Sequence, residues 1–393
     1  MEKKHIVIVG RRNVGKSSLI NCILQQNKAI VSKLPGTTTD PVKKSYELPG
    51  VASLVLVDTA GIDDEGELGI LRINKTIEAL READAAILVI THNQLEQHEE
   101  ELIQQFKKNK LPFIIVHNQS DLEQPTAIFK QNIKERFQTE LFSFSIVNPQ
   151  HESLIQQITK LIGSPKQQTL LKNLVKKHQK IMLVTPIDSE APTGRLILPQ
   201  VQMLRAILDH HCICMVLQPE ELPYYFSNHL PDLDLVITDS QVFKTVSSII
   251  PSQIPLTSFS IILAHQKGNF EKYLEGTPKI EKLKKGDRIL MLESCSHHVS
   301  CEDIGRVKIP TLLNKYTGKQ LQFDFISGLD QIQRPISDYA MIIQCGGCMI
   351  TSQQLQNRLQ PAIEAHIPIS NYGMIIAYVQ GIFERATAIF KKD

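Results

Sequence analysis

The sequence has no apolar run as long as the roughly 18 residues that a membrane-spanning helix requires. It also has little excess charge: 43 lysines and arginines balance 41 aspartates and glutamates, and the formal net charge is +2 at pH 7. This balance gives no indication of a nucleic-acid or membrane partner. Internal repeats and sustained low complexity are absent as well. An apolar strand expected from residue 5 onward leaves no room for a signal peptide, so we expect a cytoplasmic protein.

Cysteines are few but clustered. The chain of 393 residues has seven of them, an odd number, and 42% of its residues are hydrophobic. A chain of this length is expected to form two or three domains whose cores need no disulfides. In a reducing compartment, clustered cysteines more often bind metal or carry out chemistry. The seven are Cys22, Cys212, Cys214, Cys295, Cys301, Cys345 and Cys348.

Hydrophobic patterning predicts an α/β protein of three domains, because strands and helices alternate in three blocks. The first domain, 1–165, has buried apolar runs at IVIVG, SLVLVD, AAILVI and PFIIVHN, and it ends at the polar linker GSPKQQT. The second, 170–267, has strands at KIMLVTPID, CICMVLQP and LDLVITD and no nucleotide fingerprint. In the third, 268–393, the apolar runs DRILMLESC and YAMIIQCGGC end in cysteines, and helices are expected at 352–366 and 377–392.

The first apolar run leads into GRRNVGKSSL, residues 10 to 19. The pattern G-x-x-x-x-G-K-S/T between a strand and a helix predicts a phosphate-binding loop. Its glycines let backbone N–H groups approach the phosphates at the positive end of the helix. We expect Lys16 to reach the β and γ phosphates and Ser17 to ligate Mg²⁺. The other residues expected in this cradle are Gly10, Asn13, Gly15 and Ser18.

Two further segments suit the same site. DTAG (58–61) ends a strand, so Asp58 can hold the Mg²⁺ shell and Gly61 can meet the γ-phosphate with its N–H group. PGTTTD (35–40) lies between the two motifs, where a mobile loop would close on Mg²⁺ and the γ-phosphate through Thr38.

HNQSD (117–121) follows another strand and is similar to the N-K-x-D motif that recognises guanine. Asn118 and Asp121 are present, and the aspartate would accept hydrogen bonds from the base. Gln119 replaces the lysine that normally packs on the base. The two retained residues favour GTP over ATP as the nucleotide.

Together these motifs resemble those of Ras-like GTPases, and GRRNVGKSSLIN, PGTTTD and DTAGI are similar to the TrmE–Era–EngA branch. That branch often has an asparagine at the position of Asn13, which implies K⁺ binding beside the transferring phosphate. Loop geometry alone is the alternative explanation for this asparagine. Ile62 stands where Ras-like proteins carry a water-positioning glutamine, so we expect slow hydrolysis. Lys16, Thr38 and Asn13 are the residues expected to promote it.

The C-terminal cysteines suggest a metal site. ESCSHH contains Cys295-x-His297, and QCGGC contains Cys345-x-x-Cys348 on a tight Gly-Gly loop. Soft thiolates favour an iron–sulfur cluster or zinc. Spacing alone leaves open a Cys₃His zinc site and a set of unconnected buried thiols. DHHCIC (209–214) is a second grouping, which we interpret as a strand entering the core of the second domain.

Four segments of the third domain, ESCSHH, DIGRVKIP, QCGGCM and IPISNYGMIIAYVQGI, resemble the [FeFe]-hydrogenase maturation GTPases of the HydF family. The resemblance covers the whole chain. It implies a GTPase domain, a dimerisation domain and a domain that holds a [4Fe–4S] cluster through Cys295, Cys345 and Cys348. The family usually has histidine at the position of Gln344. The candidates for the fourth ligand are therefore His297, Glu302 and water, while Cys301 lies outside the matched pattern.

The resemblance implies a GTP-hydrolysing homodimer that carries a di-iron precursor of the hydrogenase active site. Radical-SAM maturation enzymes would supply this precursor, and the hydrogenase apoprotein would receive it. An alternative is a ribosome- or tRNA-associated GTPase of the TrmE–Era kind with a zinc module, although the near-neutral charge disfavours it. A structural zinc protein with a degenerate GTPase domain is a further alternative.

Overall fold

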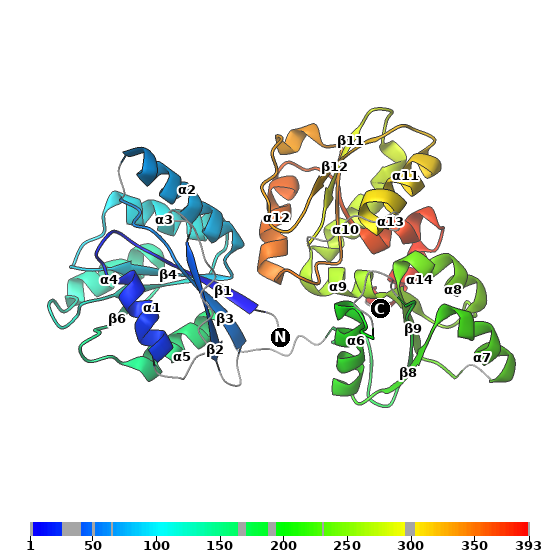
Figure 1. Ribbon diagram of the computed structural model, residues 1–393, viewed down its shortest axis with the longest axis horizontal. Coiled ribbons are helices and arrows are strands. Elements are labelled where there is room, and N and C mark those ends of the chain that lie inside the picture. Colours follow the sequence, from blue (N-terminus) through cyan, green and yellow to red (C-terminus); the bar gives the residue numbers. More distant parts are fainter. Residues whose placement is uncertain are drawn as a thin grey trace. The chain divides into compact units, whose positions relative to one another are not determined.

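The computed structural model describes residues 3–25, 41–48, 52–63, 66–163, 170–187, 194–229, 232–294 and 303–391. The chain forms two compact units, Met1–Lys166 and Gln167–Asp393 (Figure 1). Within the described ranges, no helix combines the length and the apolarity needed to cross a membrane.

The first unit is a six-stranded sheet with helices on both faces (Figure 1). Its strand order is β2-β3-β1-β4-β5-β6, and all neighbours are parallel except β2 and β3. The elements are β1 (Lys3–Val9), α1 (Lys16–Gln25), β2 (Val42–Leu48), β3 (Ala52–Asp58), α2 (Gly66–Glu82), β4 (Ala85–Ile90), α3 (Gln97–Lys108), β5 (Phe113–His117), α4 (Ala127–Phe137), β6 (Leu141–Ser143) and α5 (His151–Ile162).

Alternate residues of the central strand explain why both faces of this sheet are covered. Ile6 and Ile8 belong to an apolar cluster that side chains of α1 and α5 complete. Val7 and Val9 belong to a second cluster, which side chains of α2, α3 and α4 complete. The last four residues of this strand, Ile6 to Val9, are all apolar and fully buried, so this part of the strand must be covered on both faces.

The second unit contains two four-stranded parallel sheets, with strand orders β10-β9-β7-β8 and β12-β11-β13-β14. The elements of the first sheet and its helices are β7 (Lys180–Val184), α6 (Leu198–Asp209), β8 (Ile213–Leu217), α7 (Leu222–Asn228), β9 (Leu235–Thr238), α8 (Phe243–Ile249), β10 (Leu256–Ser258), α9 (Phe259–Lys267) and α10 (Phe270–Gly276). Those of the second are β11 (Arg288–Leu292), α11 (Ile309–Thr317), β12 (Gln322–Ile326), β13 (Met341–Gln344), α12 (Ser352–Glu364), β14 (Ile369–Asn371), α13 (Tyr372–Val379) and α14 (Phe383–Thr387).

One apolar core joins the two sheets of this unit. It contains Met182 and Val236 from the first sheet as well as Ile289 and Ile343 from the second. The division of this unit near residue 268, expected from the sequence, therefore stays a prediction.

The end of the chain returns to the first of these two sheets. Arg385 on α14 donates hydrogen bonds to the carbonyl oxygens of Ile250, Pro251 and Ile254. The Thr257 hydroxyl on β10 donates to the carbonyl oxygen of Ala386 at 2.8 Å. Helix α14 is thus part of the structure around β10, although it follows the last strand of the other sheet.

The sequence patterns missed several features. The continuous helix expected over 377–392 is wrong: α13 ends at Val379, Gly381 adopts φ 74°, and a separate short helix, α14, begins at Phe383. A positive φ is strained for most side chains, so the chain turns at this glycine. The short strands β12 and β14, which pair on either side of β11 and β13, were not predicted either.

Candidate nucleotide site and metal centre

Residues 10–15 form a tight loop between β1 and α1. The backbone conformation and the close neighbours of its first and last residues leave no room for a side chain, so both positions require glycine. Gly10 has φ 149°, and a Cβ atom there would lie 2.2 Å from the carbonyl oxygen of Val89. Gly15 has φ 87°, and a Cβ atom there would lie 2.3 Å from Nδ2 of Asn118. Backbone can approach an anion closely only where such side chains are missing, so the geometry is suitable for phosphate.

The loop surrounds the positively charged ammonium group of Lys16. Lys16 is buried, and its ammonium donates to the carbonyl oxygens of Gly10 at 2.9 Å and Arg11 at 2.6 Å. Ser17 and Ser18 are exposed in the first turn of α1, where backbone N–H groups have no partner within the helix. The ammonium and the helix terminus together attract an anion to this loop.

The DTAG segment lies beside this loop because β3 is the parallel neighbour of β1. Asp58 is level with Ile8, and its buried Oδ1 has no hydrogen-bond partner among the described residues. A buried carboxylate oxygen of this kind is suitable for a Mg²⁺ shell. A Cβ atom at Gly61 would lie 2.9 Å from the backbone nitrogen of Arg12, so this position also requires glycine. Thr38 lies outside the described residues.

The residue after Gly61 cannot position a water molecule. Ile62 is 7% exposed and packs into the core with side chains of α2 and α3. Its backbone nitrogen donates to the carbonyl oxygen of Gly10 at 3.3 Å. The apolar side chain faces the protein interior, where it offers no polar group to a nucleophile.

The segment that resembles a guanine-recognition motif is joined to the loop by hydrogen bonds. Asn118 is fully buried, its Nδ2 donates to the Val14 carbonyl oxygen at 2.8 Å, and its Oδ1 has no partner among the described residues. Gln119 adopts φ 58°, and its amide reaches the carbonyl oxygen of Asn13 at 3.5 Å. Asn13 itself is exposed at φ 62°.

Two contributors to this site were not found from the sequence. The Ser145 hydroxyl donates to Oδ1 of Asp121 and orients that carboxylate. Arg11 extends from the loop to α3, where its Nε donates to Oε1 of Glu99 at 2.8 Å. Burial raises the pKa of Glu99, and hydrogen bonds from the Glu96 backbone and from Arg11 oppose that rise. Neither contact has a signature in the sequence, because each joins segments far apart in the chain.

The metal-site residues that the structure describes lie at the carboxyl edge of the second parallel sheet of unit 2. Strands β11 and β13 are neighbours, with Leu292 level with Gln344, so Ser294 and Cys345 leave the sheet side by side. The chain continues from β11 to β12 on one side and then to β13 on the other, which makes this position a topological switch point. Parallel sheets bind ligands in the crevice at such a point, and the loop after β1 in unit 1 has the same relationship to its sheet.

Hydrogen-bond donors surround the sulfur of Cys345. The Ser294 backbone nitrogen lies 3.2 Å from Sγ, the Gly347 backbone nitrogen 3.5 Å and Nε2 of Gln344 3.4 Å. The thiol in turn donates to the Ser294 hydroxyl at 2.9 Å. Several donors around one sulfur are suitable for a thiolate that ligates a metal, because they stabilise its negative charge.

A buried lysine shapes the Gly-Gly loop. Lys267 donates to the carbonyl oxygens of Gly347 at 3.0 Å and Ile350 at 2.7 Å. Gly347 adopts φ 72°, which a glycine tolerates. Burial raises the pKa of Cys348, the nearby Cys345 raises it further, and Lys267 lowers it. Cys348 is thus placed on the same loop as Cys345, close to a fixed positive charge.

The remaining predicted metal ligands belong to the segment between β11 and α11. Cys295, His297, Cys301 and Glu302 lie outside the described residues, and Cys295 directly follows Ser294 in the chain. Among the residues that are described, no three His, Cys, Asp or Glu side chains form a metal-binding group. Two soft thiols on a loop with sulfur-directed donors fit an iron–sulfur cluster, provided that further ligands come from 295–302.

A buried carboxylate, Glu293, is held by hydrogen bonds just after the end of β11. Glu293 is 3% exposed and accepts hydrogen bonds from Nη2 of Arg306 at 2.8 Å and from the Ser327 hydroxyl at 2.9 Å. Arg358 donates to the backbone oxygen of Glu293 at 2.6 Å. Because these contacts come from separate elements, they fix the strand end that leads into Cys295.

The second cysteine grouping places one buried thiol, that of Cys212, just before the edge strand β8. Cys212 is 8% exposed, and its thiol donates to the carbonyl oxygen of Lys176 at 3.1 Å. Burial raises the pKa of Cys214 to about 11. His210 and His211 lie in the turn that precedes β8. We therefore retain the interpretation of DHHCIC as a strand entry.

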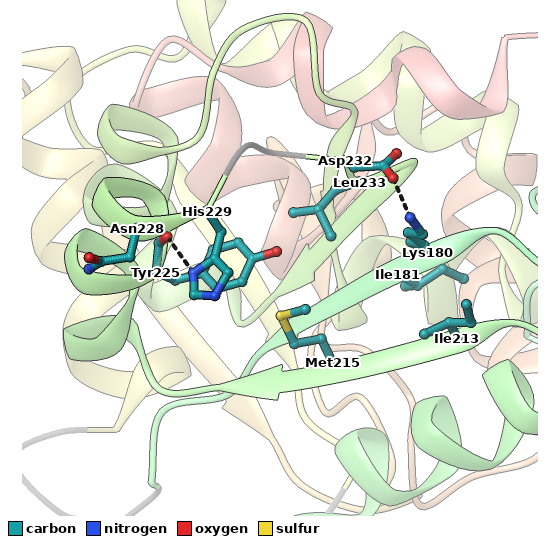
Figure 2. A pocket seen from close by; sticks show the side chains of 9 residues that line it. All are labelled: Lys180, Ile181, Ile213, Met215, Tyr225, Asn228, His229, Asp232 and Leu233. Carbon is teal, nitrogen blue, oxygen red and sulfur yellow. Dashed lines mark hydrogen bonds and ion pairs between the residues drawn. The ribbon is translucent and has the colours of Figure 1, made fainter.

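A pocket of about 610 Å³ lies on the first sheet of unit 2 (Figure 2). Tyr225 stacks on His229 with ring centroids 4.8 Å apart, and Lys180 forms an ion pair with Asp232. The lining residues are Lys180, Ile181, Ile213, Met215, Tyr225, Asn228, His229, Asp232 and Leu233. Several lie at the amino ends of β7, β8 and β9, which is the edge opposite to the one where parallel sheets bind ligands.

This fold and this loop geometry define a P-loop GTPase domain that is followed by further parallel α/β sheets. Residues 5–119 match the family model described as 50S ribosome-binding GTPase. Residues 170–268 match the hydrogen maturase F dimerization domain, and residues 271–389 match the hydrogen maturase F tetramerization domain. The chain belongs to the hydrogen maturase F family, which confirms both the resemblance and the expected α/β fold class.

Two curated relatives match about a third of this chain. The tRNA modification GTPase MnmE of Syntrophobacter fumaroxidans is 38% identical over 133 residues, which are 34% of this chain and 27% of that protein. MnmE of Staphylococcus haemolyticus is 42% identical over 119 residues, which are 30% of this chain and 26% of that protein. The chain thus covers about a quarter of the length of these relatives.

Two solved structures resemble this chain with low sequence identity and low TM-scores. A crystal structure of Era in complex with MgGDPNP and nucleotides of 16S ribosomal RNA is 21% identical, covers 56% of this chain and 93% of its own, and has a TM-score of 0.36. The G domain of the T. maritima FeoB iron transporter is 21% identical, covers 41% of this chain and 99% of its own, and has a TM-score of 0.33. Scores this low carry no argument about function.

Proposed function

We propose that this chain is a GTP-hydrolysing scaffold that carries a di-iron precursor of the [FeFe]-hydrogenase active site on a [4Fe–4S] cluster. The observation that supports it most directly is the juxtaposition of Ser294 and Cys345 at the switch point of the last sheet, in a chain that also has a complete phosphate-binding loop.

For the nucleotide, Lys16 exchanges its two loop carbonyls for the β and γ phosphates, and the backbone of Gly15 to Ser18 cradles them. Ser17, Thr38 and Asp58 complete the Mg²⁺ shell. Asn118 and Asp121 select guanine. Hydrolysis is slow because the buried Ile62 supplies no water-positioning group. K⁺ held by Asn13 supplies positive charge instead.

For the cluster, Cys295, Cys345 and Cys348 are the thiolate ligands, and the fourth iron site is left to an exchangeable group. His297, Glu302 and water are the candidates for that group. When bound, the cluster offers an iron at which cargo can replace the weak ligand. The chain's own residues hold the thiolates at one edge and stabilise their charge with N–H groups.

The partners follow from this role: radical-SAM maturation enzymes supply the precursor, and the hydrogenase apoprotein receives it. The protein itself would act as a homodimer or a larger assembly. β8 is an edge strand of apolar sequence, ICMVL, with Ile213 55% and Val216 44% exposed. An edge without charge or proline favours pairing with another strand, and a second copy of β8 would supply one by two-fold symmetry.

The metal content of the purified protein distinguishes this proposal from the two zinc-binding alternatives. Protein purified anaerobically is expected to contain iron and acid-labile sulfide in equal amounts and no stoichiometric zinc. Lys16→Ala should abolish GTP turnover without changing the iron content, whereas Lys134→Ala, an exposed lysine elsewhere in the same unit, should change neither. Stoichiometric zinc without sulfide would instead favour a tRNA-associated GTPase with a zinc module, or a structural zinc protein.

A further inference from the structure

We infer that Gln344 donates a hydrogen bond to the sulfur of Cys345 and thereby positions and tunes that ligand, without ligating iron itself. The inference deepens the proposed function and rests on it, because it assumes that Cys345 ligates the cluster. It concerns the position at which this chain departs from the family pattern.

The side chain of Gln344 is held in one place. Gln344 is the last residue of β13, is fully buried, and is level with Leu292 on β11 and Asn371 on β14. Its Nε2 donates to the Ser294 hydroxyl at 3.1 Å and lies 3.4 Å from Sγ of Cys345. Its backbone oxygen accepts from Nδ2 of Asn371 at 3.2 Å. Both ends of the residue are therefore fixed by neighbouring strands.

The amide orientation follows from the charge on its neighbour. Nε2 carries two hydrogens and has no lone pair available for a metal, so it can only donate. The reverse orientation would place Oε1 against Sγ of Cys345, where an oxygen lone pair and a thiolate repel each other. Oε1 points instead into a buried site where no described residue donates to it.

Ligation by this residue is also chemically unfavourable. A glutamine can bind a metal only through its carbonyl oxygen, and here Nε2 rather than that oxygen lies 3.4 Å from Sγ of Cys345. Loss of the Cys345 thiol proton on metal binding leaves the Ser294 hydroxyl free to turn its own hydrogen toward the sulfur. The loaded sulfur would then be surrounded by donors from Ser294, Gln344 and Gly347.

Such donors have a measurable consequence. Hydrogen bonds to ligand sulfur stabilise the reduced cluster, which is the more negative form, and they raise its reduction potential. Gln344 is thus expected to make the cluster easier to reduce. The fourth iron ligand must then come from a group other than Gln344.

The test uses the full-length, cluster-loaded protein with three substitutions. Gln344→Met keeps the length of the side chain but removes the N–H donor. Gln344→Glu keeps its shape and replaces the donor with a carboxylate. Ser370→Ala is the matched control, because Ser370 is fully buried in the adjacent strand and bonds to the Thr277 hydroxyl at 2.6 Å, away from Cys345.

Both Gln344 variants should retain the iron and sulfide content of the wild type. Gln344→Met should shift the midpoint potential to a more negative value, Gln344→Glu should shift it further, and Ser370→Ala should leave it unchanged. An unchanged potential in Gln344→Met overturns the inference. Loss of iron in both Gln344 variants, with iron retained in Ser370→Ala, also overturns it, because it assigns ligation to Gln344.

A measurement on the wild type needs no substitution. With ¹⁵N in the glutamine side chains, pulsed electron paramagnetic resonance of the reduced cluster should detect a weak ¹⁵N coupling, and its absence overturns the inference. Failure of the proposed function is distinguishable, because the wild-type protein would then contain no iron–sulfur cluster. A cluster that is present but indifferent to Gln344 refutes only the inference.

Discussion

Asn118 donates a hydrogen bond from Nδ2 to the carbonyl oxygen of Val14 at 2.8 Å. Both groups are buried, and the bond joins the end of β5 to the phosphate-binding loop across 104 positions of the sequence. This hydrogen bond therefore holds the segment expected to recognise the base in a fixed position relative to the loop expected to hold the phosphates. A change at either is expected to affect the other.

The first prediction concerns this bond. Asn118→Ala leaves the Val14 carbonyl oxygen buried without a partner, which costs roughly 1–3 kcal/mol. If that cost falls on the nucleotide-binding state, affinity for GDP falls on the order of tenfold, since about 1.4 kcal/mol corresponds to that factor. Titration with a fluorescent GDP analogue measures the change. Asn109→Ala, at the exposed end of α3, should bind like the wild type, and equal affinity in both variants would refute the prediction.

The second prediction concerns K⁺. GTP turnover should be faster in K⁺ than in Na⁺ salts, and Asn13→Ala should lose the difference. Because Asn13 adopts φ 62°, alanine there also adds backbone strain of about 1–2 kcal/mol. Asn13→Gly removes the same side chain without that strain, so it separates the two effects. If Asn13→Gly keeps the K⁺ stimulation, the side chain has no part in it and loop geometry alone explains the asparagine.

The third prediction concerns the contact between the loop and α3. Arg11→Ala leaves the fully buried Glu99 carboxylate without its cation, and breaking a buried pair costs about 3–5 kcal/mol. Glu96→Ala removes the exposed partner of the same arginine and should cost under about 1 kcal/mol. The chain has no tryptophan, so amide hydrogen exchange in β1 and α1 is the appropriate measurement. Similar losses of protection in both variants would contradict the assignment.

The fourth prediction concerns assembly. Val216→Lys places a charge on the β8 edge, where two strands of like sequence would pair, and should convert the full-length protein to a smaller species in sedimentation velocity. Leu122→Lys is the control, because Leu122 is 78% exposed but belongs to the other unit. If Val216→Lys sediments like the wild type, the interface lies on another surface.

The fifth prediction concerns the cluster ligands. Cys295→Ala, Cys345→Ala and Cys348→Ala should each lose iron and sulfide after anaerobic reconstitution. His297→Ala and Glu302→Ala should keep the cluster and change only its spectrum or its response to added imidazole, because a single exchangeable ligand can be replaced by water. Cys22→Ala is a control for the loss of a buried thiol in the other unit. Iron that survives removal of Cys345 but not of Cys301 would show that the ligand set is wrong.

Features with a local cause were predictable from the sequence. Gly10 and Gly15 could be placed because their positive φ angles require glycine wherever the loop turns. The strands around the two sites were found from unbroken apolar runs. Both cysteine segments were recognised as the ends of apolar runs. In the structure Ser294 and Cys345 meet because β11 and β13 are parallel neighbours that end at one edge of the sheet.

Other features were not predictable, because they depend on contacts between residues far apart in the sequence or on elements too short to show a pattern. The Arg11–Glu99 pair joins residues 88 positions apart, and nothing near Glu99 distinguishes it from its exposed neighbours on α3. Strand β14 has only three residues, Ile369–Asn371, too few to show a period. The break at Gly381 was detectable, since glycine weakens a helix, but the apolar residues on either side obscured it.

The bond between Thr257 and Ala386 has a consequence for how the protein is made. A ribosome synthesises the chain from its amino end, so the first unit can fold as soon as it emerges. The packing of β10 against α14 cannot be completed at the equivalent point, because Ala386 is added 129 positions after Thr257. That packing must wait until Ala386 has been synthesised. A message truncated between the codons for Thr257 and Ala386 would therefore release a nascent chain with an intact nucleotide-binding unit and without the packing of α14 against β10.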